Sequence, residues 1–305
     1  MYEAVRAEHF QDLFCKPELL AFARLVITEG YVEAAPGHEN AMRALLQQAF
    51  AALEACQGDE RQFQAATDAL VRDVYCKQDP QFWFNQVYNR YKQEIKPQRR
   101  FKNLQPWLSG ERVLDLGCGD GLTSLILSQH AYRPILADVL DYRAEAARRL
   151  PFAPMPEPQA IPYPDGSADT AILLAVLHHV AASDLTPLLA ELRRVSRRVI
   201  VEEDCYAPPG DLPRFGAQSQ ALLDLFMALP VEDQLRYLMF VDYFANAITQ
   251  GLSQMQMPFN FKTVGEWQEL FAGQGFVVRN TLMMGFQTGF FNRSCHVWFI
   301  LDSVE

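Results

Sequence analysis

The sequence predicts an α/β fold with a doubly wound, mostly parallel sheet and an antiparallel closing strand. Between residues 110 and 205, short β-rich runs alternate with helical stretches, which is the pattern of βαβ units. The first run ends at a glycine-rich segment, GCGDG, at Gly117–Gly121. The 305 residues are half hydrophobic and about a fifth charged, so a sizeable core is available.

Residues 1–105 are expected to form a helical N-terminal region. Apolar residues recur at helical spacing from Met42 to Cys56 and again from Phe63 to Val74. A third apolar face runs from Phe84 to Ile95 and includes Tyr91. The remaining residues, 106–305, are expected to form the α/β domain.

The α/β domain is read from its β-rich runs. Strands are expected at Arg112–Leu116, Arg133–Ala137, Asp169–Leu174, Arg198–Glu202, Phe276–Met283 and Cys295–Leu301, with a helix at Val264–Ala272. A helical insertion is expected at about 207–262, after the chain break Pro208-Pro209-Gly210. Its apolar stripe from Tyr237 to Ile248 predicts a core or a lid over a substrate pocket.

Composition limits the partners. The formal net charge of −10 argues against a general affinity for nucleic acid, because such binding neutralises phosphates. The chain has no run of about 18 apolar residues, so no membrane segment is expected. The first residues mix acids with apolar residues, unlike a secretory signal peptide, and six scattered cysteines form no CxxC pair. A cytoplasmic protein is therefore expected, and a homodimer is left open.

Two basic clusters stand out, at Lys96–Lys102 and Arg193–Arg198. Each is either a local anion site or a solvated helix face or helix end.

The glycine segment predicts a ligand that approaches the backbone closely. A glycine loop between a strand and a helix exposes backbone N–H groups and a helix N-terminus. The dinucleotide fingerprint G-x-G-x-x-G fails here, because position 122 is leucine and the third glycine is Gly121. A nicotinamide-dependent oxidoreductase is therefore a weaker alternative.

The segment Asp115-Leu-Gly-Cys-Gly-Asp-Gly resembles the first motif of the class I S-adenosylmethionine-dependent methyltransferases, acid-x-G-x-G-x-G. The resemblance implies a Rossmann-like, seven-stranded sheet and S-adenosylmethionine as cofactor. It implies that Gly117, Cys118, Gly119 and Gly121 bend around the methionine part of the cofactor. Asp115 would order that loop or meet the cofactor's amino group.

Further residues extend the resemblance. In ILADVLDYR, Asp138 stands where the family keeps an acid that accepts both ribose hydroxyls, followed by Val139. The run EPQAIPYPDGSADTAILLAVLHHV is similar to a family segment in which Glu157 would accept from the adenine amino group. Pro158 has no N–H to donate to adenine, so the register is shifted or adenine is held differently. Ala175 would lie beneath the cofactor.

The family resemblance also places Tyr91 on a helix that closes over the cofactor, where a tyrosine reaches the cofactor's carboxylate. The alternative for this residue is packing in the core.

The candidate catalytic residues are His178 and His179, which follow the strand expected at Asp169–Leu174. Histidine titrates near neutrality and can take a proton from an acceptor hydroxyl or amine. The alternative is that one packs or caps the next helix while the other faces solvent. The acids Glu202-Glu203-Asp204 come at the end of the strand expected at Arg198–Glu202 and provide a base, a site for a substrate amine, a metal site with His178, or a solvated edge. No metal is expected.

The expected activity is methyl transfer from S-adenosylmethionine to the oxygen, nitrogen or carbon of a small-molecule acceptor. One alternative is an accessory or regulatory protein that binds S-adenosylmethionine without transfer. Another is a protein or RNA methyltransferase.

Overall fold

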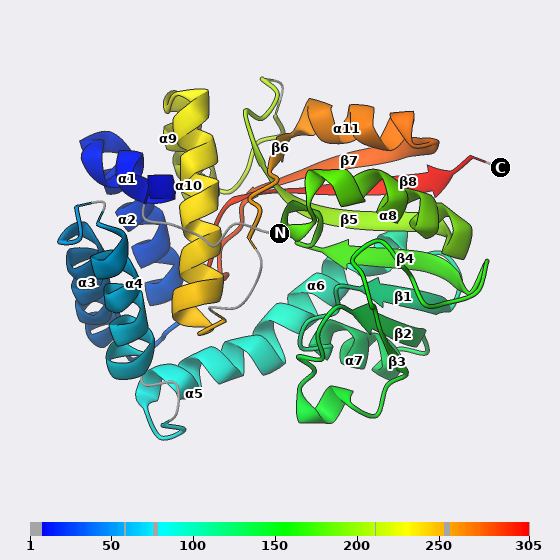
Figure 1. Cartoon of the computed structure of the whole chain (residues 1–305), viewed down its shortest axis with the longest axis horizontal. Helices are drawn as coiled ribbons and strands as arrows, with labels where there is room; N and C mark the ends of the chain where they lie inside the picture. The colour runs from blue at the N-terminus through cyan, green and yellow to red at the C-terminus, as the bar shows by residue number, and fades with distance from the viewer. Residues whose placement is uncertain (1–7, 58, 76–78, 211, 253–256, 305) are drawn as a thin grey trace. The chain divides into compact units, whose positions relative to one another are not determined.

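The computed structural model describes residues 8–57, 59–75, 79–210, 212–252 and 257–304. The chain forms two compact units, which are shown in Figure 1 and are described separately. Unit 1 consists of Met1–Tyr91, Cys205–Phe261 and Met284–Cys295, and unit 2 of Lys92–Asp204, Lys262–Met283 and His296–Glu305. The expected division into residues 1–105 and 106–305, with an insertion at about 207–262, stays a prediction about domains.

Unit 2 is built on a mixed sheet in which the described strands follow the order β3-β2-β1-β4-β5-β8-β7, with β6 paired to β5. The strands are β1 (Arg112–Leu116), β2 (Arg133–Asp138), β3 (Phe152–Pro154), β4 (Ala168–Leu174), β5 (Ser196–Tyr206), β6 (Lys262–Thr263), β7 (Phe276–Phe286) and β8 (Cys295–Ser303). The pairs β1–β2, β1–β4, β2–β3 and β4–β5 are parallel, whereas β8 is antiparallel to β5. The predicted mostly parallel sheet of seven strands with an antiparallel last strand is confirmed. The short β6 is an addition to it.

The central strands form because their residues are buried on both faces of the sheet. In β1 every residue after Arg112 is buried, and Leu114 pairs with Ile135 of β2 and Ala171 of β4. A parallel strand covered on both faces has a near-continuous apolar sequence, as Val113-Leu114 and Val199-Ile200-Val201 do.

Helices connect these strands. They are α6 (Lys96–Leu104), α7 (Leu122–Gln129), α8 (Ala182–Val195) and α11 (Val264–Gly273), with short turns η3 (Gln105–Trp107), η4 (Glu145–Ala147) and η5 (Leu177–His179). Helix α11 begins with a capping box. In it the Thr263 hydroxyl accepts from the backbone N–H of Glu266 at 3.2 Å, and the Glu266 carboxylate accepts from the N–H of Thr263 at 2.8 Å.

Unit 1 is mainly helical. Its helices are α1 (Glu8–Cys15), α2 (Pro17–Glu33), α3 (Glu39–Glu54), α4 (Glu60–Ala69), α5 (Trp83–Arg90), α9 (Ala217–Ala228) and α10 (Val231–Tyr243). Helices α4, α5 and α10 continue as π-helical turns, η1 (Leu70–Val74), η2 (Tyr91–Ile95) and η6 (Phe244–Thr249), and η2 leads directly into α6 of unit 2. Turns of this type are common at functional positions.

Aromatic rings from distant segments make the core of unit 1. The Phe10 ring lies 5.0 Å from that of Tyr243 and 5.6 Å from that of Phe240, and Phe22 lies 4.9 Å from Tyr237. Tilted and edge-on pairs at these distances are favourable beyond the area they bury. The apolar stripe predicted in the insertion is therefore buried within unit 1, and its role as a substrate lid stays a prediction.

None of the helices in the described part of the chain is both long enough and apolar enough to cross a bilayer.

A glycine in unit 1 provides a test of this packing. A Cβ at Gly30 of α2 would lie 2.4 Å from the carbonyl oxygen of Phe291. Backbone cannot move as easily as a flexible side chain, so we expect Gly30→Ala to destabilise the protein by about 1–3 kcal/mol. Gly265 of α11 meets nothing within 4 Å, and Gly265→Ala should stabilise the protein by about 0.5–1 kcal/mol. Thermal unfolding of both variants measures these changes in stability. A Gly30→Ala protein as stable as the wild type would contradict the packing of α2 against Phe291.

Candidate functional site

The glycine loop joins β1 to α7 in a conformation that depends on glycine at Gly117. Its φ is +67°, and an added Cβ would lie 2.8 Å from the Val176 side chain. The N–H of Gly117 donates to the carbonyl of Ala137 at 2.8 Å, which ties the loop to β2. The loop therefore lies close to the ends of both β2 and β4.

Gly119 has a different surrounding. Its φ is +54°, and an added Cβ would meet no atom of the described residues within 4 Å. Its N–H donates to the carboxylate of Asp138 at 2.8 Å. The middle of the loop therefore borders open space, as a loop that receives a ligand requires.

Asp138 ends β2 and is buried. Besides the Gly119 N–H, its carboxylate accepts the N–H of Leu140 at 3.4 Å. Burial raises the pKa of Asp138, while these backbone N–H groups favour its charged form. A carboxylate offers about four lone-pair sites, so acceptor capacity remains for hydroxyl donors. Next to it, Val139 and Leu140 are exposed by 47% and 50%, and they provide an apolar surface beside the carboxylate.

Asp115 lies under the loop, and its side chain is almost fully buried. It accepts a hydrogen bond from the Ser124 hydroxyl of α7 at 2.7 Å. Burial raises its pKa to about 6, although the Ser124 hydrogen bond and the charge of Arg100 act in the opposite direction. Asp115 therefore connects β1 to α7 from beneath the glycine loop.

Three further residues were predicted to bind the cofactor. Cys118 is half-buried, and burial raises the pKa of its thiol well above the usual value, which keeps it neutral. Ala175 follows β4 with φ of +61°, and its N–H donates to the Glu202 carbonyl at 2.8 Å. Glu157 is exposed and accepts from the Gln159 side chain at 2.9 Å. It lies two residues after Met155, whose N–H donates to the Asp138 carbonyl at 2.8 Å.

Tyr91 belongs to unit 1, where it is buried. Its ring centroid lies 4.7 Å from that of Phe291 and 6.2 Å from that of Tyr88. Its proposed contact with the cofactor stays a prediction.

A buried carboxylate organises the turn after β4. Glu203 of β5 is fully buried and accepts the N–H groups of Val176 and Leu177 at 3.1 and 2.6 Å. Its other oxygen lies 2.6 Å from Nδ1 of His178, which is 2% exposed. A solvated acidic edge is therefore wrong for Glu202 and Glu203, because both side chains are buried.

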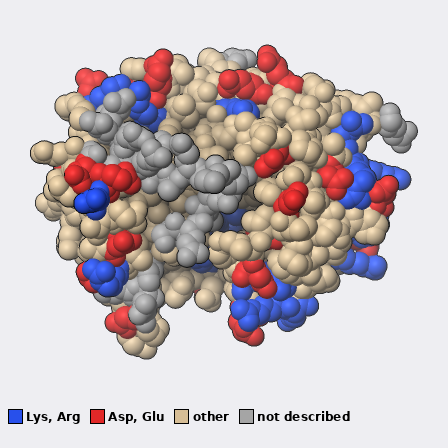
Figure 2. Space-filling model, viewed as in Figure 1, with Lys and Arg blue, Asp and Glu red and all other residues tan. Residues whose placement is uncertain are grey.

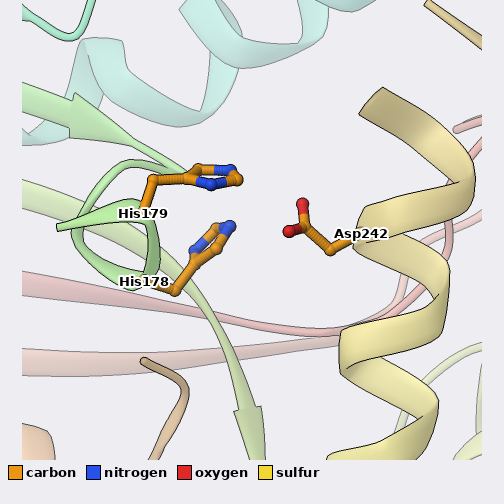
Figure 3. Close-up of side chains that lie close together, drawn as sticks. All are labelled: His178, His179 and Asp242. Atoms are coloured by element: carbon orange, nitrogen blue, oxygen red, sulfur yellow. The ribbon is translucent and has the colours of Figure 1, made fainter. Parts of the chain in front are cut away.

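The two candidate histidines lie side by side, as Figure 3 shows, with ring centroids 4.2 Å apart and planes tilted by 44°. His178 bonds to Glu203, and His179 is the more exposed of the two. The sequence placed both at the end of β4, and the structure distinguishes them by this carboxylate.

The sequence indicated Arg100 only as a member of the basic cluster Lys96–Lys102, without a place at this edge of the sheet, and it did not single out Lys92. Arg100 of α6 lies 3.0 Å from the Glu202 carboxylate and donates to the Leu174 carbonyl at 3.3 Å. Lys92 of η2 lies 3.4 Å from Asp120 of the glycine loop. Lys92, Lys96 and Arg100 recur at every fourth position, and this spacing is the signal that was available, because residues four apart share a helix face.

Residues 114–198 match the family model described as a methyltransferase domain. Unit 2 thus carries a class I S-adenosylmethionine-dependent methyltransferase domain, and S-adenosylmethionine is its cofactor. No curated protein matches the sequence.

Solved structures with the same type of fold are distant in sequence. A protein from Pyrococcus horikoshii OT3 is 15% identical, covering 69% of this chain and 92% of its own, with a TM-score of 0.44. A methyltransferase from Methanosarcina mazei is 16% identical, covering 66% and 97%, with a TM-score of 0.48. One from Mesorhizobium loti is 16% identical, covering 68% and 98%, with a TM-score of 0.46.

The residues present fit this cofactor. The open space at Gly119, the carboxylate of Asp138 and the exposed Val139 provide a close backbone approach, a hydroxyl acceptor and an apolar surface within one short region. The individual roles predicted for these residues stay predictions.

Asp138 can be tested directly. Loss of two charge-assisted hydrogen bonds to ribose should weaken binding of S-adenosylhomocysteine by about 100-fold or more in Asp138→Ala. Asp141→Ala is the matched control, because Asp141 lies three residues after Asp138 in the same segment and its carboxylate pairs with Arg143. Calorimetric titration measures both variants, and equal affinities would contradict the ribose role.

Asp115 predicts a pH dependence of stability. Its folded pKa of about 6 lies above the unfolded value of 3.8, so the folded state holds its proton more tightly. The stability that this group contributes is present below pH 4 and is lost as the pH rises to 6, by about 3 kcal/mol. Asp115→Asn should therefore gain stability relative to the wild type between pH 4 and pH 7.

The control for this experiment is Asp141→Asn. The Arg143 guanidinium lowers the pKa of Asp141 to about 2, so its titration lies below pH 4. Urea unfolding at several pH values should show a constant difference from wild type for this control. A difference in stability between Asp115→Asn and wild type that also stays constant with pH would contradict a raised pKa for the buried Asp115 carboxyl.

Proposed function

We propose that unit 2 transfers the methyl group of S-adenosylmethionine to a small-molecule acceptor, with His178 as the general base and Glu203 as the residue that positions it. The observation that carries this proposal is the bond of 2.6 Å between Glu203 and Nδ1 of His178. The cofactor, when bound, supplies an electrophilic methyl group on its sulfonium. The chain's own residues bind and orient the acceptor and take up its proton.

Glu203 is suited to fix both the tautomer and the orientation of His178. A neutral imidazole has one donor and one acceptor nitrogen, so an N–H at Nδ1 directed at the carboxylate leaves Nε2 as the acceptor. The carboxylate itself is held by the N–H groups of Val176 and Leu177. A proton taken up at Nε2 produces an imidazolium that the adjacent carboxylate stabilises.

A small acceptor is favoured by charge. The formal net charge is −10, and in Figure 2 Lys and Arg side chains on the visible face lie next to Asp and Glu side chains. A nucleic-acid surface concentrates positive charge instead, because affinity comes from phosphate contacts. The cytoplasmic location and a homodimer stay predictions.

The experiment measures formation of S-adenosylhomocysteine by the purified chain with three sets of acceptors: small phenols, amines and carboxylic acids; total RNA; and a protein extract. We expect turnover with a member of the first set. Transfer only to RNA or protein would overturn the small-molecule proposal. Binding of S-adenosylmethionine without transfer to any acceptor would favour an accessory protein.

The base can be tested by substitution. We expect His178→Ala to lower kcat by about 10²–10⁴-fold, the usual contribution of a general base, with S-adenosylhomocysteine affinity unchanged. His179→Ala is the matched control and should keep kcat within about threefold of the wild type, because no proton transfer is assigned to it. Equal losses in the two variants would contradict the assignment.

Glu203 requires a separate variant. Glu203→Gln should lower kcat in the wild type but have no further effect in His178→Ala, because a positioning residue acts only through the histidine. Additive losses in the double variant would show that Glu203 acts by another route.

A further inference from the structure

Three cations lie four residues apart on the segment from η2 into α6: Lys92, Lys96 and Arg100. Residues at this spacing share one helix face. The contacts of the outer two show where that face points: Lys92 reaches Asp120 of the glycine loop, and Arg100 reaches Leu174 at the end of β4 and Glu202 of β5. We refer to these three residues as the cationic stripe.

Lys96 differs from its neighbours in the stripe. In the described part of the chain it has no hydrogen bond or ion pair, although it is only partly exposed. The charge of Arg100 and burial lower its pKa to about 7, while Asp120 and Glu202 act in the opposite direction. Two positive neighbours and partial burial therefore disfavour the charged form of a lysine whose side chain has no direct ion pair among the described residues.

Arg100 adds a second donor without an acceptor. Its terminal nitrogen contacts Glu202 and the Leu174 carbonyl, yet its Nε is buried and has no hydrogen-bond partner among the described residues. Buried donors without acceptors are unfavourable, so such a group points to an acceptor that the chain does not supply. An anionic oxygen at the stripe would accept from Lys96 and offset the repulsion among the cations.

The position of the stripe favours one source of that anion. Open parallel sheets bind ligands at the carboxyl ends of their strands. Lys92 already pairs with the glycine loop, whereas Arg100 contacts the last residue of β4 and Glu202 of β5. His178 lies on the turn that follows β4, and Glu203 is the next residue of β5. Arg100 therefore lies on the side of the edge on which the proposed base lies, and Lys96 precedes it by one helical turn, between Lys92 and Arg100.

We propose that Lys96 and Arg100 form a subsite for an anionic group, a carboxylate or a phosphate, carried by the methyl acceptor. This inference rests on the proposed function, since it assigns a class of substrate to the same site. The acceptor is then a small organic anion, which the stripe holds by charge-assisted hydrogen bonds while its nucleophilic atom faces the base.

The test uses the full chain and two probes, inorganic phosphate and benzoate, titrated calorimetrically with and without saturating S-adenosylhomocysteine. We expect at least one probe to bind in both states and to lose about 10–100-fold in affinity in Lys96→Met, the effect of one charge-assisted hydrogen bond. Lys96→Arg should retain binding. Lys102→Met is the matched control, because Lys102 is exposed on the same helix.

Two outcomes would overturn the proposal. Competition between the probes and S-adenosylhomocysteine, with weaker S-adenosylhomocysteine binding in Lys96→Met, would assign the stripe to the cofactor's own carboxylate. Absence of probe binding in both states would remove the subsite. Neither outcome depends on transfer, so the subsite and the proposed function can fail separately: the first fails in titration, the second in the acceptor screen.

Discussion

The parallel pairing of β1 with β2 and β4, and of β4 with β5, is the constraint on which the rest of unit 2 depends. Parallel strands in register end at the same edge, so Leu116, Asp138, Leu174 and Glu202 reach one side of the sheet. The β4–β5 register pairs Leu174 with Glu202. Glu203 therefore lies next to the turn after β4, where it meets backbone N–H groups and His178.

That edge contains several buried carboxylates, and each is stabilised differently. Glu203 accepts two backbone N–H groups and faces an imidazole, Glu202 faces Arg100, and Asp115 has the Ser124 hydroxyl. Burial penalises the charged form unless donors or cations compensate. Asp115 has the weakest compensation of the three, a neutral hydroxyl, and burial raises its pKa to about 6. The three acids thus differ in the groups that stabilise their charged forms.

Much of the fold follows from local sequence, but the pairing of charges does not. The strand at Arg112–Leu116 was predicted with its observed bounds, because a short apolar run ending in glycines is a local signal. The expected strand Arg198–Glu202 extends to 196–206 in the structure, because pairing with β8 continues through Asp204 opposite His296. An acidic run has the composition of a solvated edge. Only the fold shows that backbone N–H groups donate to the Glu203 carboxylate. The Arg100 contact with Glu202 joins residues about a hundred positions apart, which a sequence pattern cannot indicate.

The proposed base and the proposed anion subsite complement each other electrostatically. A carboxylate behind His178 favours the imidazolium that forms when the acceptor loses its proton. The cationic stripe carries an excess of positive charge and hydrogen-bond donors, because the Lys96 side chain and the Nε of Arg100 have no acceptor among the described residues. An anionic acceptor would neutralise that excess on binding and be oriented by it, before its proton moves. A neutral acceptor of the same shape would leave both donors unsatisfied, so the proposed subsite would discriminate against it.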